Sequence, residues 1–214
     1  MLTIHAAALL LPGGGRAPVP GGAVAVRDGV IAAFGPYGEL AAVHPAARVR
    51  RWPGVLTPGL LQPGAVRLLE ESYFPDPREA DTLGTEPLTG GALDALGPDD
   101  SRRAGSVRRG LHRMLRHGTT AATAAPTAPP ALITAMRRSG LLVTGAPEHP
   151  GAVPRLDPLA GAAAVADATA APLAVGERAD LAAFDVPDEA ALLAAGAASC
   201  VATVAAGRLV YRGR

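Results

Sequence analysis

Residues 55–66 read Val55-Leu56-Thr57-Pro58-Gly59-Leu60-Leu61-Gln62-Pro63-Gly64-Ala65-Val66. Their apolar start follows an alternating segment at 48–52, which predicts a strand that runs into this stretch. Two Pro-Gly pairs then interrupt the apolar run. We expect Pro58 to Leu61 to carry the chain from one part of the fold into another. Gly64 and Val66 have no side chain that can bind a metal ion.

The segments before this stretch favour a β-rich region. Residues 2–11 are apolar and stop at a Pro-Gly turn, which predicts one strand. Residues 23–26 and 30–35 predict two strands joined by the tight turn Asp28-Gly29, a strong hairpin signal. Residues 37–44 are compatible with a short helix.

The segments after it favour alternating helices and strands. A loop rich in Gly and Pro runs to about residue 90, and Asp99 can then cap a helix that Gly118 ends. Residues 119–124 predict a strand, 129–139 a second helix and 141–144 a further strand. One apolar face of the first helix is formed by Val107, Leu111, Met114 and Leu115.

Several of these segments together resemble the amidohydrolase superfamily, and imidazolonepropionase in particular. The stretch 55–66 is similar to the pattern V-x-PGLIDxHxH of that superfamily, and the strand and hairpin before it follow in the same order. Residues 109–120 resemble its helix-to-strand junction G-x-x-x-M-L-x-x-G-T-T. Residues 174–185 and 201–211 resemble its two C-terminal segments.

The resemblance implies an α+β fold with two parts. Residues 1–60 plus 172–214 are expected to form a composite β-sandwich built from both chain termini. Residues 61–171 are expected to form a truncated remnant of a (β/α)8 barrel. A complete barrel needs roughly 200 residues or more, so the later strands, which supply further metal ligands in the family, have no counterpart in this sequence.

The resemblance fails at the metal-binding positions. Gln62 stands where the family has an aspartate, and Gly64 and Val66 stand where it has two histidines. Hydrolysis in this family depends on a metal ion that activates water. None of the five histidines forms an H-x-H or H-E-x-x-H pair. We therefore expect a degenerate active site, with no metal, no cofactor and no catalytic residues.

The overall composition gives no support to several classes of function. The chain has 20 basic and 19 acidic residues, and this balance does not favour nucleic acid or a membrane surface as a partner. No apolar run is long enough to span a membrane, and we expect a cytoplasmic protein. The single cysteine, Cys200, fits a small buried apolar side chain better than a reactive thiol.

Candidate ligand-binding residues lie in the loop after residue 66. Substrate-contacting segments occupy this position in the family, and we single out Tyr73, Asp76 and Glu86. A structural lid is the alternative for this loop. The arginine-rich helix surface at 102–116 fits a solvated outer face, with an anion or acidic-partner site as the alternative. Asp180 is expected to bond local backbone amides.

These observations predict a protein that acts as a scaffold, a partner or a ligand-binding protein without metal-dependent hydrolysis. The exposed edge strands of a truncated barrel can pair with another chain, so we expect a homo-oligomer or a protein partner that covers them. The alternative partner is a small molecule. The alternative is an active hydrolase or deaminase that uses a rearranged site to act on a non-peptide C–N bond of a cyclic or nucleoside-like substrate.

Overall fold

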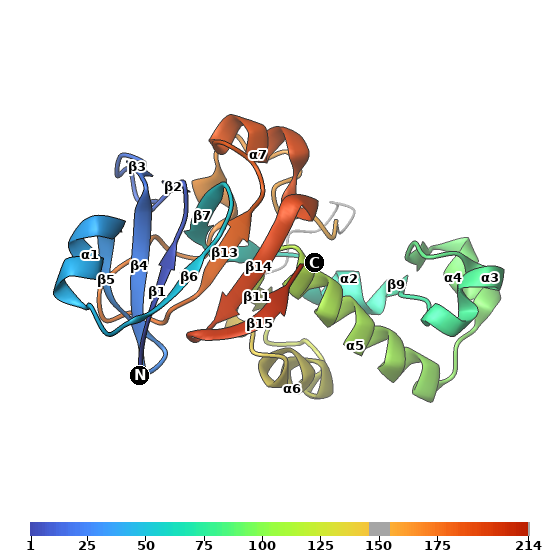
Figure 1. The fold of residues 1–214 in the computed structure, drawn as a ribbon. Helices are drawn as coiled ribbons and strands as arrows, with labels where there is room; N and C mark the ends of the chain where they lie inside the picture. Colours follow the sequence, from blue (N-terminus) through green and yellow to red (C-terminus); the bar gives the residue numbers. More distant parts are fainter. Residues whose placement is uncertain (146–154, 214) are drawn as a thin grey trace. The chain divides into compact units, whose positions relative to one another are not determined.

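The computed structural model of the protein describes residues 1–145 and 155–213, which form helices and several sheets (Figure 1). The chain divides into two compact units. The first comprises Met1–Leu61, Leu115–Ala121 and Asp157–Arg214, and the second comprises Gln62–Met114 and Ala122–Leu156. This mixture of sheets and helices confirms the predicted α+β class.

A four-stranded sheet with the order β5-β4-β1-β6 forms one layer of the first unit. The strands are β1 (Leu2–Ala6), β4 (Gly22–Arg27), β5 (Val30–Pro36) and β6 (Arg48–Arg51), and helix α1 (Tyr37–Val43) follows β5. The predicted hairpin is confirmed, because β4 and β5 pair antiparallel across Asp28 and Gly29. Both turn residues have positive φ, 52° and 87°, as a tight turn of this kind requires.

The second layer of the first unit is a six-stranded sheet with the order β15-β14-β13-β7-β2-β3. Its strands are β2 (Leu9–Leu10), β3 (Val19–Pro20), β7 (Val55–Pro58), β13 (Leu181–Phe184), β14 (Cys200–Ala205) and β15 (Arg208–Arg212). Strand β7 lies between β2 and β13, so the segment 55–58 joins strands from both ends of the chain. Helix α7 (Glu189–Ala195) and the 3-10 helices η2 (Val165–Ala168) and η3 (Ala197–Ser199) also belong to this unit.

Alternating side chains on β4 explain how the layers pack. Val24 and Val26 join a buried cluster with Leu56, Leu181 and Val204 of the six-stranded sheet. The residues between them, Ala23 and Ala25, face the other way, toward α1. Since successive side chains of a strand point to opposite faces, this two-residue period places the main core between the two sheets.

The apolar run at residues 2–11 is not the single strand that the sequence predicts. It breaks after Ala6, so that β1 belongs to the four-stranded sheet and β2 to the six-stranded sheet. The break is held by backbone hydrogen bonds: Ala7 N donates to Gly22 O at 3.0 Å, and Leu9 N donates to Gly54 O at 3.0 Å. Hydrophobicity alone could not show that the run changes sheets.

The second unit is mainly helical. It contains α2 (Ala65–Glu70), β9 (Ser72–Tyr73), η1 (Pro77–Glu79), α3 (Ala80–Leu83), β10 (Leu88–Thr89), α4 (Gly91–Leu96), most of α5 (Asp100–Arg116), α6 (Pro130–Arg138) and β12 (Leu142–Gly145). The predicted cap is present, because Arg102 N donates to Asp99 Oδ1 at 2.8 Å. A three-stranded sheet with the order β12-β11-β8 includes β8 (Leu60–Gln62) and β11 (Thr119–Ala124).

None of the helices in the described part of the chain is both long enough and apolar enough to span a bilayer.

Two glycines of α5 are expected to respond in opposite directions to replacement by alanine. A Cβ at Gly110 would lie 2.6 Å from Leu69 Cδ2 and 2.7 Å from Phe74 Cε2, inside the packed core. Overpacking of this kind lowers the free energy of unfolding by about 1–3 kcal/mol. A Cβ at Gly105 would meet only the flexible end of Arg109, at 3.0 Å. At this position, the better helix propensity of alanine should raise the free energy of unfolding by about 0.5–1 kcal/mol.

Urea unfolding of Gly110→Ala and Gly105→Ala measures both changes. If the two variants shift the unfolding midpoint in the same direction, the packing of α5 against Leu69 and Phe74 is contradicted.

Candidate functional site

The three positions at which the sequence resemblance implies metal binding are Gln62, Gly64 and Val66, and two of them, Gln62 and Val66, are buried. Val66 lies in α2 and is only 3% exposed. Gln62 is buried, and its Nε2 donates to the backbone oxygen of Arg155 at 2.7 Å. Gly64 is the residue before α2, and its N–H donates to Gln62 Oε1 at 3.4 Å. These residues do not fit a metal ion, because an amide that is already bonded, a glycine and a buried valine supply no ligand set.

The titratable side chains do not offer a substitute set within the described residues. No group of three or more His, Cys, Asp or Glu side chains lies there in a position to hold a metal ion. His5 is buried and accepts a hydrogen bond at Nδ1 from Trp52 Nε1 at 3.2 Å. His149 lies outside the described residues.

The loop candidates Tyr73, Asp76 and Glu86 lie in different surroundings. The Tyr73 hydroxyl donates to Glu79 Oε2 at 2.7 Å. Asp76 accepts from Arg109 Nη1 at 3.2 Å. Glu86 is exposed and takes part in neither of these bonds. Of the three candidates, Tyr73 borders a cavity of the second unit.

Glu79 is the centre of the network that holds this loop. It accepts hydrogen bonds from the Tyr73 hydroxyl, from Asp76 N at 2.8 Å and from Arg102 Nη2 at 2.7 Å. These bonds, that of Tyr73 foremost, lower the pKa of Glu79 to about 2 because they favour the charged carboxylate. Burial and the bond to Glu79 raise the pKa of Tyr73.

The arginine-rich face of α5 is more than a solvated surface. Arg109 Nε donates to Phe74 O at 2.7 Å, and Arg103 Nε donates to Pro98 O at 3.2 Å. Arg113 donates to Thr85 O. With the ion pair between Arg102 and Glu79, these contacts tie the preceding loop to the helix. These side chains therefore have a structural role that the sequence pattern does not predict.

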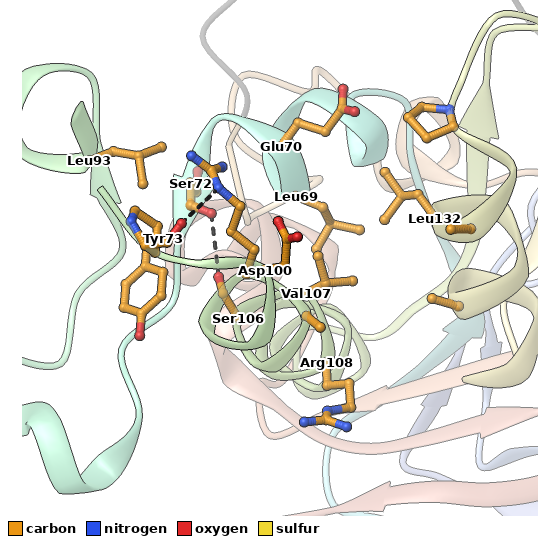
Figure 2. Close-up of a pocket in the computed structure, with 16 residues that line it drawn as sticks. Leu69, Glu70, Ser72, Tyr73, Leu93, Asp100, Ser106, Val107, Arg108 and Leu132 are labelled. Atoms are coloured by element: carbon orange, nitrogen blue, oxygen red, sulfur yellow. Dashed lines mark hydrogen bonds between the residues drawn. The ribbon is translucent and has the colours of Figure 1, made fainter. Parts of the chain in front are cut away.

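A cavity of about 680 Å³ lies within the second unit, beside α5 and α6. Figure 2 shows Leu93 and Tyr73 on one side and Leu132 on the other, with Leu69 and Val107 between them. The volume is within the range of roughly 300–1,000 Å³ that is typical of small-molecule sites. Polar lining residues include Glu70, Ser72, Asp100, Arg103 and Arg108. The arrangement can enclose an apolar molecule with polar groups at its border.

Tyr73 and the apolar face that includes Val107 are predicted from the sequence, but most of the residues that line the cavity are not. Leu93 and Leu132 come from short helices far apart in the sequence, α4 and α6. In the sequence, each is a large apolar residue of a short helical segment. Ordinary core residues show the same pattern, so it does not indicate a cavity.

Two further expectations concern single residues, and the structure confirms the burial of Cys200. Cys200 is buried, and this burial raises the pKa of its thiol to about 11, so the thiolate is disfavoured. Asp180 accepts from a backbone amide, but from that of Ala206, which is distant in the sequence, at 2.8 Å, and its near neighbour Arg178 donates through the side-chain Nε at 2.9 Å.

Several solved structures are similar to parts of this chain. Aspergillus niger ochratoxinase is 20% identical, with a TM-score of 0.44, over 67% of this chain and 31% of its own. Helicobacter pylori aminofutalosine deaminase is 15% identical, with a TM-score of 0.45, over 68% of this chain and 33% of its own. Escherichia coli guanine deaminase is 13% identical, with a TM-score of 0.46, over 68% of this chain and 36% of its own. This chain spans about a third of the length of each. None of the curated proteins matches the chain.

A family model matches the hairpin region of the first unit. The match covers residues 22–47, which contain β4, β5 and α1. The model describes the imidazolonepropionase-like composite domain of bacteria. The predicted resemblance to an imidazolonepropionase-like domain is therefore confirmed in these residues.

Proposed function

We propose that this chain is an amidohydrolase-like protein that binds a ligand and does not carry out metal-dependent hydrolysis. The burial of Val66 in α2 carries this proposal, because the position that bears a metal ligand in the family is here part of an apolar core. Gln62 supports it, since its amide is already bonded to the backbone of residue 155.

In this proposal the first unit is a composite β-sandwich, and the second is a barrel remnant inserted into it. The pairing of β7 with β13, over residues 55–58 and 181–184, supports the sandwich, because these strands come from opposite ends of the chain. The strand order β12-β11-β8 with the intervening helices α5 and α6 supports the remnant.

The ligand is a small and mainly apolar molecule that occupies the cavity of the second unit. Leu69, Leu93 and Leu132 are each buried to at least nine-tenths and supply the apolar wall. Burial of apolar surface contributes roughly 25 cal/mol per Å², so such a wall favours apolar rather than charged ligands.

A thermal-shift screen of the intact protein tests ligand binding. Neutral aromatic compounds, cyclic amides and nucleosides form the panel. A compound at ten times its Kd adds about 1.4 kcal/mol to the free energy of unfolding, which raises Tm by about 3–6 °C. Ala135→Phe places a ring from α6 into the cavity and should weaken binding by about tenfold or more, whereas Thr134→Phe, one residue away on the exposed surface, should not.

Two results count against the ligand proposal. One is the absence of any shift across the panel. The other is an equal loss of binding in Ala135→Phe and Thr134→Phe, because the two side chains differ in whether they line the cavity.

The second candidate function is association with a protein partner or a second copy of the chain. The observation that favours it is β12, an edge strand of its sheet whose Leu142 is 39% exposed. Edge strands with free backbone groups can pair with another chain. Light scattering tests it: a stable monomer at all concentrations excludes self-association, and a Leu142→Lys variant should dissociate any dimer that uses this edge.

The remaining alternative is an active hydrolase or deaminase on a non-peptide C–N bond, with a rearranged site. Turnover of nucleosides or cyclic amides by the purified protein would favour it over the binding proposal.

A further inference from the structure

A groove lined by arginines lies in the first unit. It has a volume of about 290 Å³ and is bordered by β6 and β15. These two strands are edge strands, β6 of the four-stranded sheet and β15 of the six-stranded sheet. Its lining includes Arg48, Arg50 and Arg212, with Trp52 and Leu209 as apolar residues.

The register of β6 determines which arginines face the groove. Arg48 and Arg50 are the partners of Thr3 and His5 on β1. The intervening Ile4 belongs to the cluster on the α1 side, so Arg48 and Arg50 lie on the opposite face of the sheet. Arg51 also borders the groove, but its guanidinium lies 4.4 Å from the ring centre of Tyr37, on the α1 side.

The register of β15 brings the third arginine to the same space. Arg212 is the partner of Ala202, and Leu209 is the partner of Val204. Ala202 and Val204 both belong to the core between the two sheets. Arg212 and Leu209 therefore share the face that looks toward the four-stranded sheet.

These cations are not neutralised by carboxylates in the described part of the chain. The ion pairs found there involve other residues, and none includes Arg48, Arg50 or Arg212. Burial lowers the pKa of Arg50, and the charges of Arg48 and Arg212 lower it further. Like charges that crowd one concave site repel each other unless an anion is bound.

We propose that the groove of Arg48, Arg50 and Arg212 binds a phosphate group, either as free phosphate or as the end of a small organic phosphate. Guanidinium groups match the geometry of phosphate oxygens, and two of them can bind one phosphate through several charge-assisted hydrogen bonds. Leu209 is only partly buried and lies beside the charges, so the organic part of a phosphate ester can pack against it.

A purely protective role of the arginines is the opposing interpretation. Charged side chains on edge strands prevent unwanted pairing of sheets. That role requires no ligand, and it predicts that loss of an arginine promotes self-association without any dependence on phosphate.

Calorimetric titration of the intact protein with inorganic phosphate and with phenyl phosphate, at constant ionic strength set by sodium chloride, tests the proposal. We expect saturable binding that is weakened at least tenfold by Arg50→Gln and by Arg212→Gln. Arg208→Gln is the matched control, because Arg208 is exposed on the same strand as Arg212 and does not line the groove. It should bind phosphate as the unmodified protein does.

The two ligands distinguish the sources of the phosphate. Tighter binding of phenyl phosphate supports an organic phosphate, and equal affinity supports free phosphate. The proposal is overturned if neither ligand binds, or if Arg208→Gln weakens binding as much as the groove variants do. Arg212 is exposed, so Arg212→Gln remains a folded test if Arg50→Gln does not fold.

Discussion

Replacement of Val66 by histidine is expected to destabilise the protein by about 3 kcal/mol, because it exchanges a buried apolar side chain for a polar one. Val66 is 3% exposed and lies in α2 beside the buried residues Ala65, Leu68 and Leu69. The change introduces a histidine at a position where the sequence resemblance implies a metal ligand, but one new ligand does not complete a site. Urea unfolding with and without zinc measures both parts of this prediction.

The control for this variant is Glu71→His. Glu71 lies at the end of the same helix with its side chain 52% exposed, and the substitution removes its ion pair with Arg67. Exposed pairs of this kind contribute about 0–1 kcal/mol. A Val66→His protein that is as stable as Glu71→His, or that zinc stabilises strongly, would contradict the packing described for α2.

Acid is expected to destabilise the first unit through His5. Burial, and then the charge of Arg50, lower the pKa of His5 from 6.5 to about 4. As the pH falls from about 6.5 to 4, the unfolded chain takes up a proton that the folded protein does not. The free energy of unfolding therefore decreases over this window, by about 3 kcal/mol in total, and this contribution is constant above pH 6.5 and below pH 4.

Denaturant unfolding at several pH values between about 4.5 and 7.5 measures this decrease. His5→Gln keeps an oxygen that can accept the hydrogen bond of the Trp52 N–H. This variant should lose most of the slope of the free energy of unfolding against pH. His44→Gln, at the end of α1, is the control and should retain it. An unchanged slope in His5→Gln would show that other groups cause the acid sensitivity.

Local signals in the sequence were sufficient for the elements that are fixed by nearby residues. Asp28-Gly29 fixes the β4–β5 hairpin, and Asp99 and Gly118 mark the two ends of α5. Each of these features depends on a turn or cap within a few residues, so tertiary contacts do not override it.

Features that depend on distant contacts could not be predicted in the same way. The loop after Tyr73 contains short helices that are held by arginines of α5; for example, Arg109 donates to Phe74 O. The sequence of neither segment indicates which residues of the other it contacts. The groove of Arg48, Arg50 and Arg212 requires the register of two edge strands that are far apart in the sequence. Sequence patterns give the face of a strand, but they do not give its neighbour.

The metal content of the purified protein tests the central claim most directly. The protein is expressed with added zinc and iron, purified without chelators, and analysed by inductively coupled plasma mass spectrometry. Because Gln62, Gly64 and Val66 offer no ligand set, we predict far less than one metal ion per chain. One tightly bound zinc or iron ion per chain would contradict the account and favour a hydrolase with a rearranged site.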